Sequence, residues 1–275
     1  MDKEITWLLK DKYNFSDSQI NDFLLNSRLL PPTSRGRNDD RDIYAKIQKD
    51  LKRLKTGEPI NYIIGWQDFL DCKIDLSFKP LIPRVETEFW VKNVIDVLTT
   101  KHFSTLVENY NLSILDLCCG SGCIGISILK HILHSKVVFV DIDSNFIEQT
   151  KLNLEINQIP ENRYKIIKSD LFANINEKFD YIFTNPPYVS KNDTVPKSLK
   201  FEPEVALFAN NNGMEIIEKI LNNFQGYLNP DGQLFLEFGQ EQQVGIKKIL
   251  KKNNLLTYFF NNDQYGKKRY LQVSL

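Results

Sequence analysis

Apolar residues recur at helical spacing near the start of the chain. Four of them are separated by four, four and three positions: Ile43, Ile47, Leu51 and Leu54. This spacing places them on one face of a helix, which Gly57 and Pro59 end. An earlier segment over residues 16–30 has the same character. The pattern predicts a small helical unit over residues 1–60.

The texture changes between residues 62 and 82, where apolar side chains sit in short runs that alternate with polar ones. The apolar positions are Trp66, Phe69, Ile74, Leu76 and Phe78. A period of two on either side of Asp71-Cys72 is typical of a β-hairpin. We therefore expect a β-hairpin linker over residues 61–84.

From residue 85 onward, apolar runs alternate with amphipathic stretches. The expected strands are 113–118, 136–142, 164–169, 179–185, 232–238 and 268–275, and the expected helices are 86–98, 124–131, 144–157, 213–228 and 241–251. A continuous apolar run such as 137–140 suits a strand covered on both faces. The alternation predicts an α/β domain over residues 85–275, built on a doubly wound, mostly parallel sheet.

Composition and charge exclude several classes of protein. The 275 residues include 35 basic and 35 acidic side chains, so the basic excess that usually marks a duplex-binding protein is missing. The apolar runs are too short to span a bilayer. Four cysteines, three of them within six residues, do not resemble a disulfide framework. These features favour an intracellular protein in a reducing compartment, with no membrane and no direct nucleic-acid partner.

Two motifs follow the first two strands of this domain. The segment from Cys118 to Gly122 is a turn of small residues that leads from a strand into a helix, whose free N–H groups suit a nucleotide-like ligand. Asp141 ends the next strand, where a carboxylate can accept hydrogen bonds from ribose hydroxyls. Gly120, Gly122 and Gly125 also fit the glycine spacing of a nicotinamide or flavin enzyme, and a tight turn without a ligand is a third interpretation.

The sequence Asn-Pro-Pro-Tyr follows the strand at 179–185, at the edge where open α/β sheets bind ligands. Pro186 and Pro187 fix the backbone, so that the Pro186 carbonyl is held as an acceptor. Asn185 adds a second carbonyl acceptor. Two convergent acceptors suit a planar –NH₂ group, over which Tyr188 could close.

These motifs resemble those of the S-adenosylmethionine-dependent amino-methyltransferases. Within them the chain is similar to the HemK/PrmC family, the protein-(glutamine-N5) methyltransferases that modify class I peptide release factors. The similarity extends over residues 57–88, the turn and helix after residue 115, and the sequences Leu-Ile-Pro-Arg at 81–84 and Phe-Glu-Pro at 201–203. It implies a seven-stranded class I methyltransferase fold, S-adenosyl-L-methionine as cofactor and a release factor as protein substrate, which the helical unit would grip.

The resemblance also implies roles for individual residues. The implied cofactor-binding residues are Cys118, Cys119, Gly120, Ser121, Gly122, Asp141, Asp170, Leu171 and Asn185. The implied substrate-binding residues are Asn185, Pro186, Pro187 and Tyr188, of which Asn185, Pro186 and Tyr188 are expected to be catalytic. Cys118 stands where the family usually has a glycine.

Other interpretations stay open. The same chemistry could act on a ribosomal-protein glutamine or on a nucleic-acid exocyclic amine, and a nicotinamide-dependent oxidoreductase is a more distant alternative. A zinc site drawn from Cys118, Cys119, Cys123, His131 and His134 has the wrong spacing, so no metal is expected. No histidine is assigned a catalytic role. The sequences of residues 86–91 and of the N-terminus favour a mitochondrial protein slightly over one of bacterial cytoplasm.

Overall fold

A computed structural model describes residues 2–25, 38–103 and 111–275. The chain divides into two compact units, Met1–Trp66 with Pro196–Phe201 and Gln67–Val195 with Glu202–Leu275. No helix within the described ranges is long and apolar enough to cross a bilayer.

The first unit is helical. Its elements are α1 (Asp2–Trp7), a π-helical turn η1 (Leu8–Lys12), α2 (Asp17–Leu25), α3 (Asn38–Lys55), α4 (Ile60–Ile64) and a 3₁₀ turn η3 (Lys197–Phe201). Ile47 packs with Leu9 and Ile20 in the interior. Ile43, which the spacing predicted to face inward, is exposed instead. Residues 26–30 of the predicted helix 16–30 lie outside the described residues.

A buried carboxylate fastens α3 to η1. Asp50 accepts hydrogen bonds from Lys12 Nζ at 2.6 Å, from the Tyr13 hydroxyl at 2.8 Å and from Arg53 at 3.1 Å. Burial of a charge is tolerated only where it is paired and hydrogen-bonded. The three donors therefore explain why an acidic residue can lie in the interior of so small a unit.

The predicted β-hairpin is confirmed. Strands β1 (Trp66–Phe69) and β2 (Cys72–Asp75) pair in a two-stranded sheet. Leu70 and Asp71 join them with positive φ angles of 46° and 61°, as in the two-residue turns that suit the twist of a hairpin. After the turn, Asn153 and Gln149 of helix α7 (Ser144–Ile156) hold the chain by accepting hydrogen bonds from the backbone N–H groups of Asp75 and Phe78.

The second unit contains a seven-stranded sheet, which confirms the predicted fold class. Its strands are β3 (Leu112–Leu117), β4 (Ser135–Asp141), β5 (Tyr164–Lys168), β6 (Phe179–Thr184), β9 (Leu228–Glu237), β10 (Tyr258–Asn262) and β11 (Lys268–Ser274). They lie in the order β10-β11-β9-β6-β3-β4-β5. Strands β3, β4, β5, β6 and β9 are parallel, and β11 is antiparallel to both neighbours. Strand β10 was not among the strands that the sequence pattern predicted.

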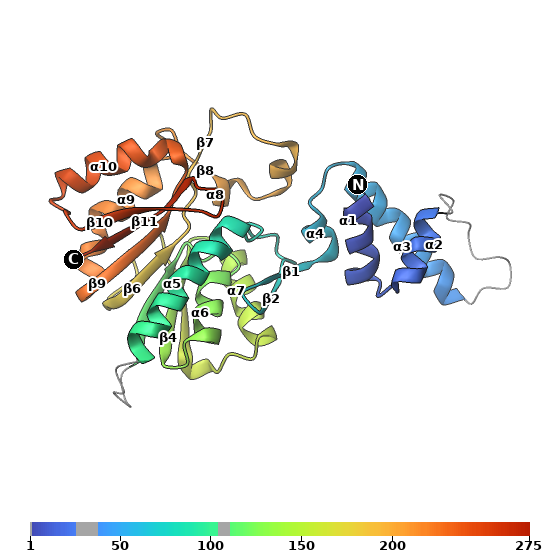
Figure 1. Cartoon of the computed structure of the whole chain (residues 1–275), viewed down its shortest axis with the longest axis horizontal. Coiled ribbons are helices and arrows are strands. Elements are labelled where there is room, and N and C mark those ends of the chain that lie inside the picture. The colour runs from blue at the N-terminus through green and yellow to red at the C-terminus, as the bar shows by residue number, and fades with distance from the viewer. Residues whose placement is uncertain (1, 26–37, 104–110) are drawn as a thin grey trace. The chain divides into compact units, whose positions relative to one another are not determined.

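Helices cover both faces of this sheet (Figure 1). On one face lie α5 (Val85–Phe103), α6 (Cys123–His131) and α7 (Ser144–Ile156), and on the other lie α9 (Glu215–Asn223) and α10 (Gln243–Lys252). The predicted helix 213–228 is shorter than expected, because its last turn is the 3₁₀ helix η4 (Phe224–Tyr227). The remaining elements are 3₁₀ turns η2 (Glu161–Arg163) and η5 (Gln240–Gln242), helix α8 (Glu204–Leu207) and the paired short strands β7 (Val189–Ser190) and β8 (Phe208–Ala209).

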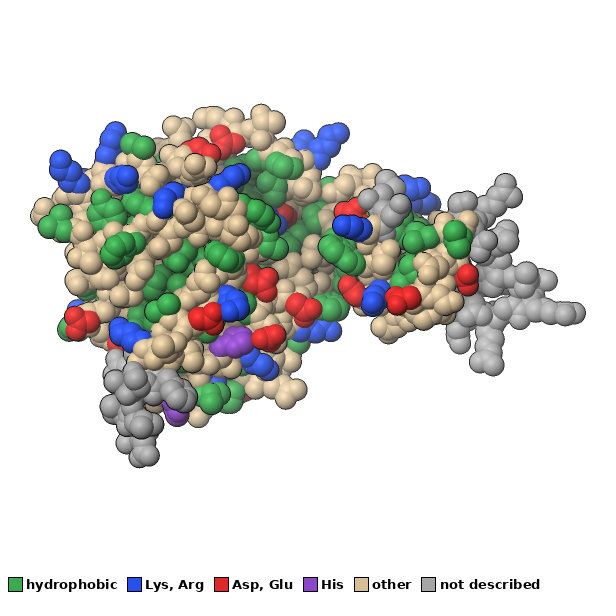
Figure 2. All heavy atoms as spheres, viewed as in Figure 1, with side chains coloured by type: hydrophobic (Ala, Val, Ile, Leu, Met, Phe, Trp, Pro, Cys, Tyr) green, Lys and Arg blue, Asp and Glu red, His purple; other side chains and the backbone are tan. Residues whose placement is uncertain are grey.

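The strand order fixes where a ligand can bind. The chain enters the sheet at β3, adds β4 and β5 on one side and then returns to place β6 on the other. Connections therefore leave β3 and β6 in opposite directions, which opens a crevice at the carboxyl ends of these strands. On the visible face of the larger unit, basic and acidic side chains are interspersed (Figure 2).

Candidate active site

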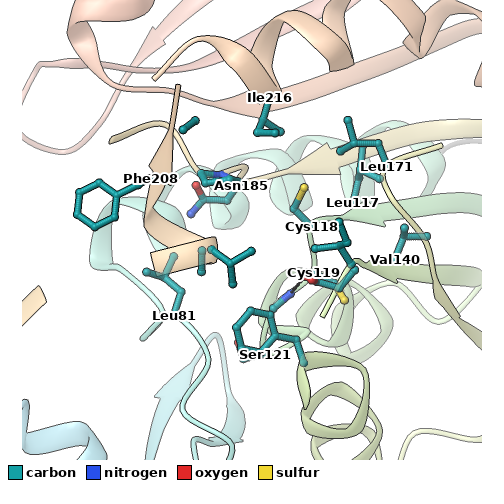
Figure 3. A pocket seen from close by; sticks show the side chains of 18 of the residues that line it. Leu81, Leu117, Cys118, Cys119, Ser121, Val140, Leu171, Asn185, Phe208 and Ile216 are labelled. Atoms are coloured by element: carbon teal, nitrogen blue, oxygen red, sulfur yellow. Dashed lines mark hydrogen bonds between the residues drawn. The ribbon is translucent and has the colours of Figure 1, made fainter. Parts of the chain in front are cut away.

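A cavity of about 210 Å³ lies at the carboxyl ends of β3, β4 and β6. Loops from all three strands, and from β5, contribute to its lining, which includes Cys118, Cys119, Gly120, Ser121, Asp141, Asp170, Leu171, Asn185 and Pro187. Cys118 and Cys119 come from the end of β3, while Asn185 and Phe208 lie on the opposite side (Figure 3). The structure thus brings together most of the residues that the sequence motifs suggested.

The turn after β3 has a left-handed backbone. Cys118 has a φ of 60° and Gly122 a φ of 76°, a region that disfavours side chains other than glycine. Cys118 therefore carries strain that the glycine usual in the family would avoid. Gly122 does not line the cavity; it is the N-cap of α6, and a Cβ there would lie 2.9 Å from Cγ2 of Thr150.

Helix α7 supports this turn with polar side chains that sequence analysis did not single out. Thr150 Oγ1 donates to the Gly120 carbonyl at 3.2 Å, and Asn153 Nδ2 donates to the Ser121 carbonyl at 2.9 Å. Both side chains are fully buried. They donate to backbone carbonyls that would otherwise have no hydrogen-bond partner, and so they fix the shape of the turn.

Asp141 lies at the end of β4, as predicted, and it lines the cavity. Its Oδ2 accepts from the Gly120 N–H at 2.9 Å, and its Oδ1 accepts from the Asp143 N–H at 3.1 Å. Burial raises the pKa of this carboxyl, while the backbone donors oppose the shift. Each oxygen of a carboxylate can accept more than one hydrogen bond, so Asp141 can hold the turn and still bind a ligand hydroxyl.

Asp116, within β3, is a second buried carboxyl group that the motifs did not reveal. Its Oδ2 accepts from the Gly125 N–H at 2.9 Å, and its Oδ1 has no partner among the described residues. Burial raises the pKa of Asp116 to about 8. A protonated, uncharged Asp116 therefore anchors the first turn of α6 from below.

Asp170 and Leu171 also line the cavity, together with Phe146 of α7. Phe172, the residue after Leu171, is buried in the core and stacks on Tyr227 at 4.4 Å between ring centroids. Phe146 therefore supplies an aromatic ring to the lining; its place in the site depends on the packing of α7 and left no motif in the sequence.

The Asn-Pro-Pro-Tyr segment is divided between the cavity and the interior. Asn185 and Pro187 line the cavity, whereas Pro186 and Tyr188 do not. The hydroxyl of Tyr188 donates to Oε1 of Glu237 at 3.0 Å, and its ring packs against the core. The sequence led us to expect that the Tyr188 ring closes over a substrate. In the structure the ring instead lies against the core, where its hydroxyl donates to the buried Glu237 carboxyl group.

Two sequence segments that carried the family resemblance meet at the rim. The Arg84 guanidinium donates to Oε1 of Glu202 at 2.7 Å, and the Ile82 N–H donates to Oε2 at 3.0 Å. Glu202 is buried. The contact joins the loop bearing Leu81 to the segment bearing Phe208, and both of these residues line the cavity.

The three cysteines in and beside the turn after β3 show no sign of a reactive or metal-binding thiol. Burial raises the pKa of Cys118, Cys119 and Cys123, so their thiols stay protonated. No group of three or more His, Cys, Asp or Glu side chains in the described part of the chain is arranged to hold a metal ion. His131 Nε2 lies 3.0 Å from the carbonyl of Leu70 in the hairpin turn, and it does not line the cavity.

Comparison with known proteins identifies the family. Residues 85–200 match the methyltransferase small domain. The chain is 33% identical over 228 residues to the release factor glutamine methyltransferase of Lactococcus lactis, covering 81% of this chain and 79% of that protein. It is 34% identical over 218 residues to the enzyme of the same name from Francisella tularensis, covering 78% and 74%.

A solved structure has the same fold at low sequence identity. A methyltransferase from Pyrococcus furiosus superposes with a TM-score of 0.52 at 16% identity, covering 85% of this chain and 97% of that one. The seven-stranded methyltransferase fold and the resemblance to the HemK/PrmC family are both confirmed. The chain therefore belongs to the release factor glutamine methyltransferase family.

Proposed function

We propose that this protein transfers a methyl group from S-adenosyl-L-methionine to the side-chain amide nitrogen of the glutamine in the Gly-Gly-Gln motif of a class I release factor. The observation that carries the proposal is the placement of Asn185 at a cavity that also contains Asp141. An amide acceptor thus faces a site whose other end suits a ribose. The family membership supports the same reaction.

The residues that line the cavity suit the chemistry of the cofactor. Asp141 can accept from ribose hydroxyls, and Phe146 and Leu171, which line the same cavity as Asp170, supply apolar surface that suits a purine. Cys118 to Ser121 surround the end of β3, where the methionine portion would bind. When bound, S-adenosylmethionine supplies a methyl group on a positively charged sulfur that is a good leaving group.

The task of the protein is to orient a weak nucleophile. The lone pair of an amide nitrogen is delocalised into its carbonyl, so attack requires the nitrogen to be aimed at the methyl carbon. Asn185 Oδ1 would accept one N–H bond of the substrate amide; the Pro186 carbonyl, expected from the sequence as the second acceptor, belongs to a residue that does not line the cavity. Holding two reactants in an aligned geometry is worth up to about 7–11 kcal/mol in favourable cases. The methylated nitrogen is acidic, so no histidine or other general base is needed.

We further propose that the helical unit recognises the release factor. It presents a groove lined by cationic, aromatic and apolar side chains: Lys12, Tyr13, Ile43, Lys46, Lys49 and Arg53. The hydrogen bonds to Asp50 give this groove a fixed floor. A rigid surface of mixed character suits the recognition of a folded protein.

The direct test is mass spectrometry of a class I release factor after incubation with this protein and S-adenosylmethionine. We expect one added methyl group on the glutamine of the Gly-Gly-Gln motif, and none when Asn185→Ala replaces the wild type. The matched control is Asn192→Ala, because Asn192 does not line the cavity. If a preparation that binds the cofactor transfers no methyl group, the release-factor assignment is wrong and the search moves to ribosomal proteins and nucleic-acid amines.

A further inference from the structure

Glu237, at the end of β9, is a buried carboxyl group on which three side chains converge. Thr87 Oγ1 and Trp90 Nε1 both donate to its Oε2 at 2.7 Å, and the Tyr188 hydroxyl donates to its Oε1 at 3.0 Å. Glu237 is 1% exposed. Two of the donors come from α5 and the third ends the Asn-Pro-Pro-Tyr segment, so the carboxyl group joins three parts of the domain.

The direction of these hydrogen bonds is determined by chemistry. An indole N–H can only donate, and the oxygen that receives it must be an acceptor. Oε2 of Glu237 therefore accepts from Trp90, and it accepts from Thr87 as well. Burial raises the pKa of Glu237, but a proton held on Oε1 leaves Oε2 an acceptor. Where Glu237 is ionised, or protonated on Oε1, the single hydroxyl proton of Thr87 therefore points toward Glu237.

This direction passes on to Asn185. Thr87 Oγ1 lies 3.2 Å from Nδ2 of Asn185. Because the Thr87 hydroxyl donates its single proton to Glu237, it can only accept a hydrogen bond from Asn185. The group of Asn185 that faces it must be the –NH₂ group, and the Oδ1 atom is left to accept from elsewhere. The reverse orientation would set an acceptor against an acceptor.

We propose that Thr87 and Glu237 are positioning residues that hold the Asn185 amide with Oδ1 turned to the substrate. This inference rests on the proposed function, because it assigns a reason for the orientation that methylation of an amide requires. A flipped Asn185 would present its own –NH₂ group to the –NH₂ group of the substrate. Glu237 does not line the cavity, whereas Thr87 does, and both act on the substrate through Asn185.

The first experiment compares Thr87→Val with Thr87→Ser. Valine keeps the shape of the side chain and removes the hydroxyl, whereas serine keeps the hydroxyl. Loss of one neutral hydrogen bond corresponds to about a five- to tenfold effect. We expect Thr87→Val to lower kcat about tenfold, with the KM for the release factor and the Kd for S-adenosylmethionine unchanged. Thr87→Ser should restore kcat to within about twofold of wild type.

Glu237→Gln is the companion variant. Its carbonyl oxygen can take the place of Oε2 and accept from Thr87 and Trp90, while its –NH₂ group faces the Tyr188 hydroxyl, which can also accept. The direction of the Thr87 hydroxyl is then preserved. We expect kcat within about threefold of wild type, which would separate the role of hydrogen-bond direction from that of charge.

The second experiment does not depend on turnover. In ¹⁵N NMR spectra, the side-chain –NH₂ signal of Asn185 is assigned by its loss in Asn185→Ala. One of its protons should exchange slowly with solvent in the wild type and faster in Thr87→Val. Fast exchange in the wild type would overturn the proposal even if Thr87→Val fails to fold. So would equal impairment of Thr87→Val and Thr87→Ser, or a kcat for Thr87→Val within twofold of wild type.

The two levels of inference can be told apart. If the wild type methylates no release factor, the proposed function fails, and slow exchange at Asn185 still supports the orientation of its amide. If the wild type is active and the Asn185 signal exchanges freely, the function stands and the roles of Thr87 and Glu237 are refuted.

Discussion

Arg84 makes the ion pair that fastens the rim of the cavity, and its replacement by methionine should weaken the domain measurably. The guanidinium of Arg84 lies 2.7 Å from Oε1 of Glu202; the Glu202 side chain is 2% exposed and that of Arg84 is 30% exposed. Removing one partner of a fully buried pair costs about 3–5 kcal/mol. Water screens the partly exposed guanidinium, and the Ile82 N–H still donates to Glu202. We therefore expect a loss of about 2 kcal/mol in the free energy of unfolding.

Differential scanning calorimetry measures this effect. For a domain of this size, a loss of about 2 kcal/mol lowers Tm by roughly 4–8 °C. Lys92→Met is the matched control, because Lys92 pairs with Asp96 four residues away and both side chains are about 60% exposed. Such a surface pair contributes less than about 0.5 kcal/mol. If Arg84→Met lowers Tm no more than Lys92→Met does, the pair with Glu202 does not stabilise the rim and the reasoning is wrong.

Three further predictions concern Asp141 in the cavity, Gly125 in helix α6 and Asp116 of β3, which accepts from the Gly125 N–H. Asp141→Asn should raise the Kd for S-adenosylmethionine about 10- to 100-fold in calorimetry, since a charge-assisted hydrogen bond contributes about 1.5–3 kcal/mol, and Asp143→Asn, which lies outside the cavity, should leave it unchanged. Gly125→Ala would place a Cβ 2.3 Å from the ring of Phe139 in β4, and it should lower the free energy of unfolding, measured by urea denaturation, by about 1–3 kcal/mol. The control Gly226→Ala, with no atom within 4 Å of the new Cβ, should change the free energy of unfolding by less than about 0.5 kcal/mol. Burial raises the pKa of Asp116 from 3.8 to about 8, so between these pH values the folded protein keeps a proton that the unfolded chain releases; this contribution to stability is complete below pH 4 and is lost as the pH rises to 8. Asp116→Asn should therefore make Tm less dependent on pH between 5 and 8. An unchanged pH dependence of Tm would contradict the assignment of a raised pKa to Asp116.

The sequence predicts structure best where a single segment carries its own signal. The strand that ends at Asp141 is a continuous apolar run, and such a run predicts a buried parallel strand without knowledge of its neighbours. Strand β10 was missed because its sequence, Tyr-Phe-Phe-Asn-Asn, is short and half polar, and only its pairing with β11 makes it part of the sheet. Helix 213–228 was predicted too long for a related reason: periodicity does not distinguish an α-helix from a 3₁₀ turn at its end.

The amide side chains along α7 are visible as a pattern in the sequence, but the pattern does not reveal that they are buried. Gln149, Asn153 and Asn157 are spaced by four residues, so the sequence places three amides on one helix face. Such a face is usually solvent-exposed, yet Gln149 and Asn153 are completely buried. They lie in the interior because backbone groups of Asp75 and Phe78, in and after the β-hairpin, and of Ser121, in the turn after β3, need hydrogen-bond partners there.

The sequence by itself determined the alternation of strands and helices, the order of the motifs and the family resemblance, because each of these is written in neighbouring residues. It could not determine which distant side chains support the site. Thr87 lies 98 positions from Asn185 and 150 from Glu237, and no local pattern links them. Only the tertiary structure brings α5, β6 and β9 together, and it does so because a buried carboxyl group must find donors wherever the packing of the sheet and its helices supplies them.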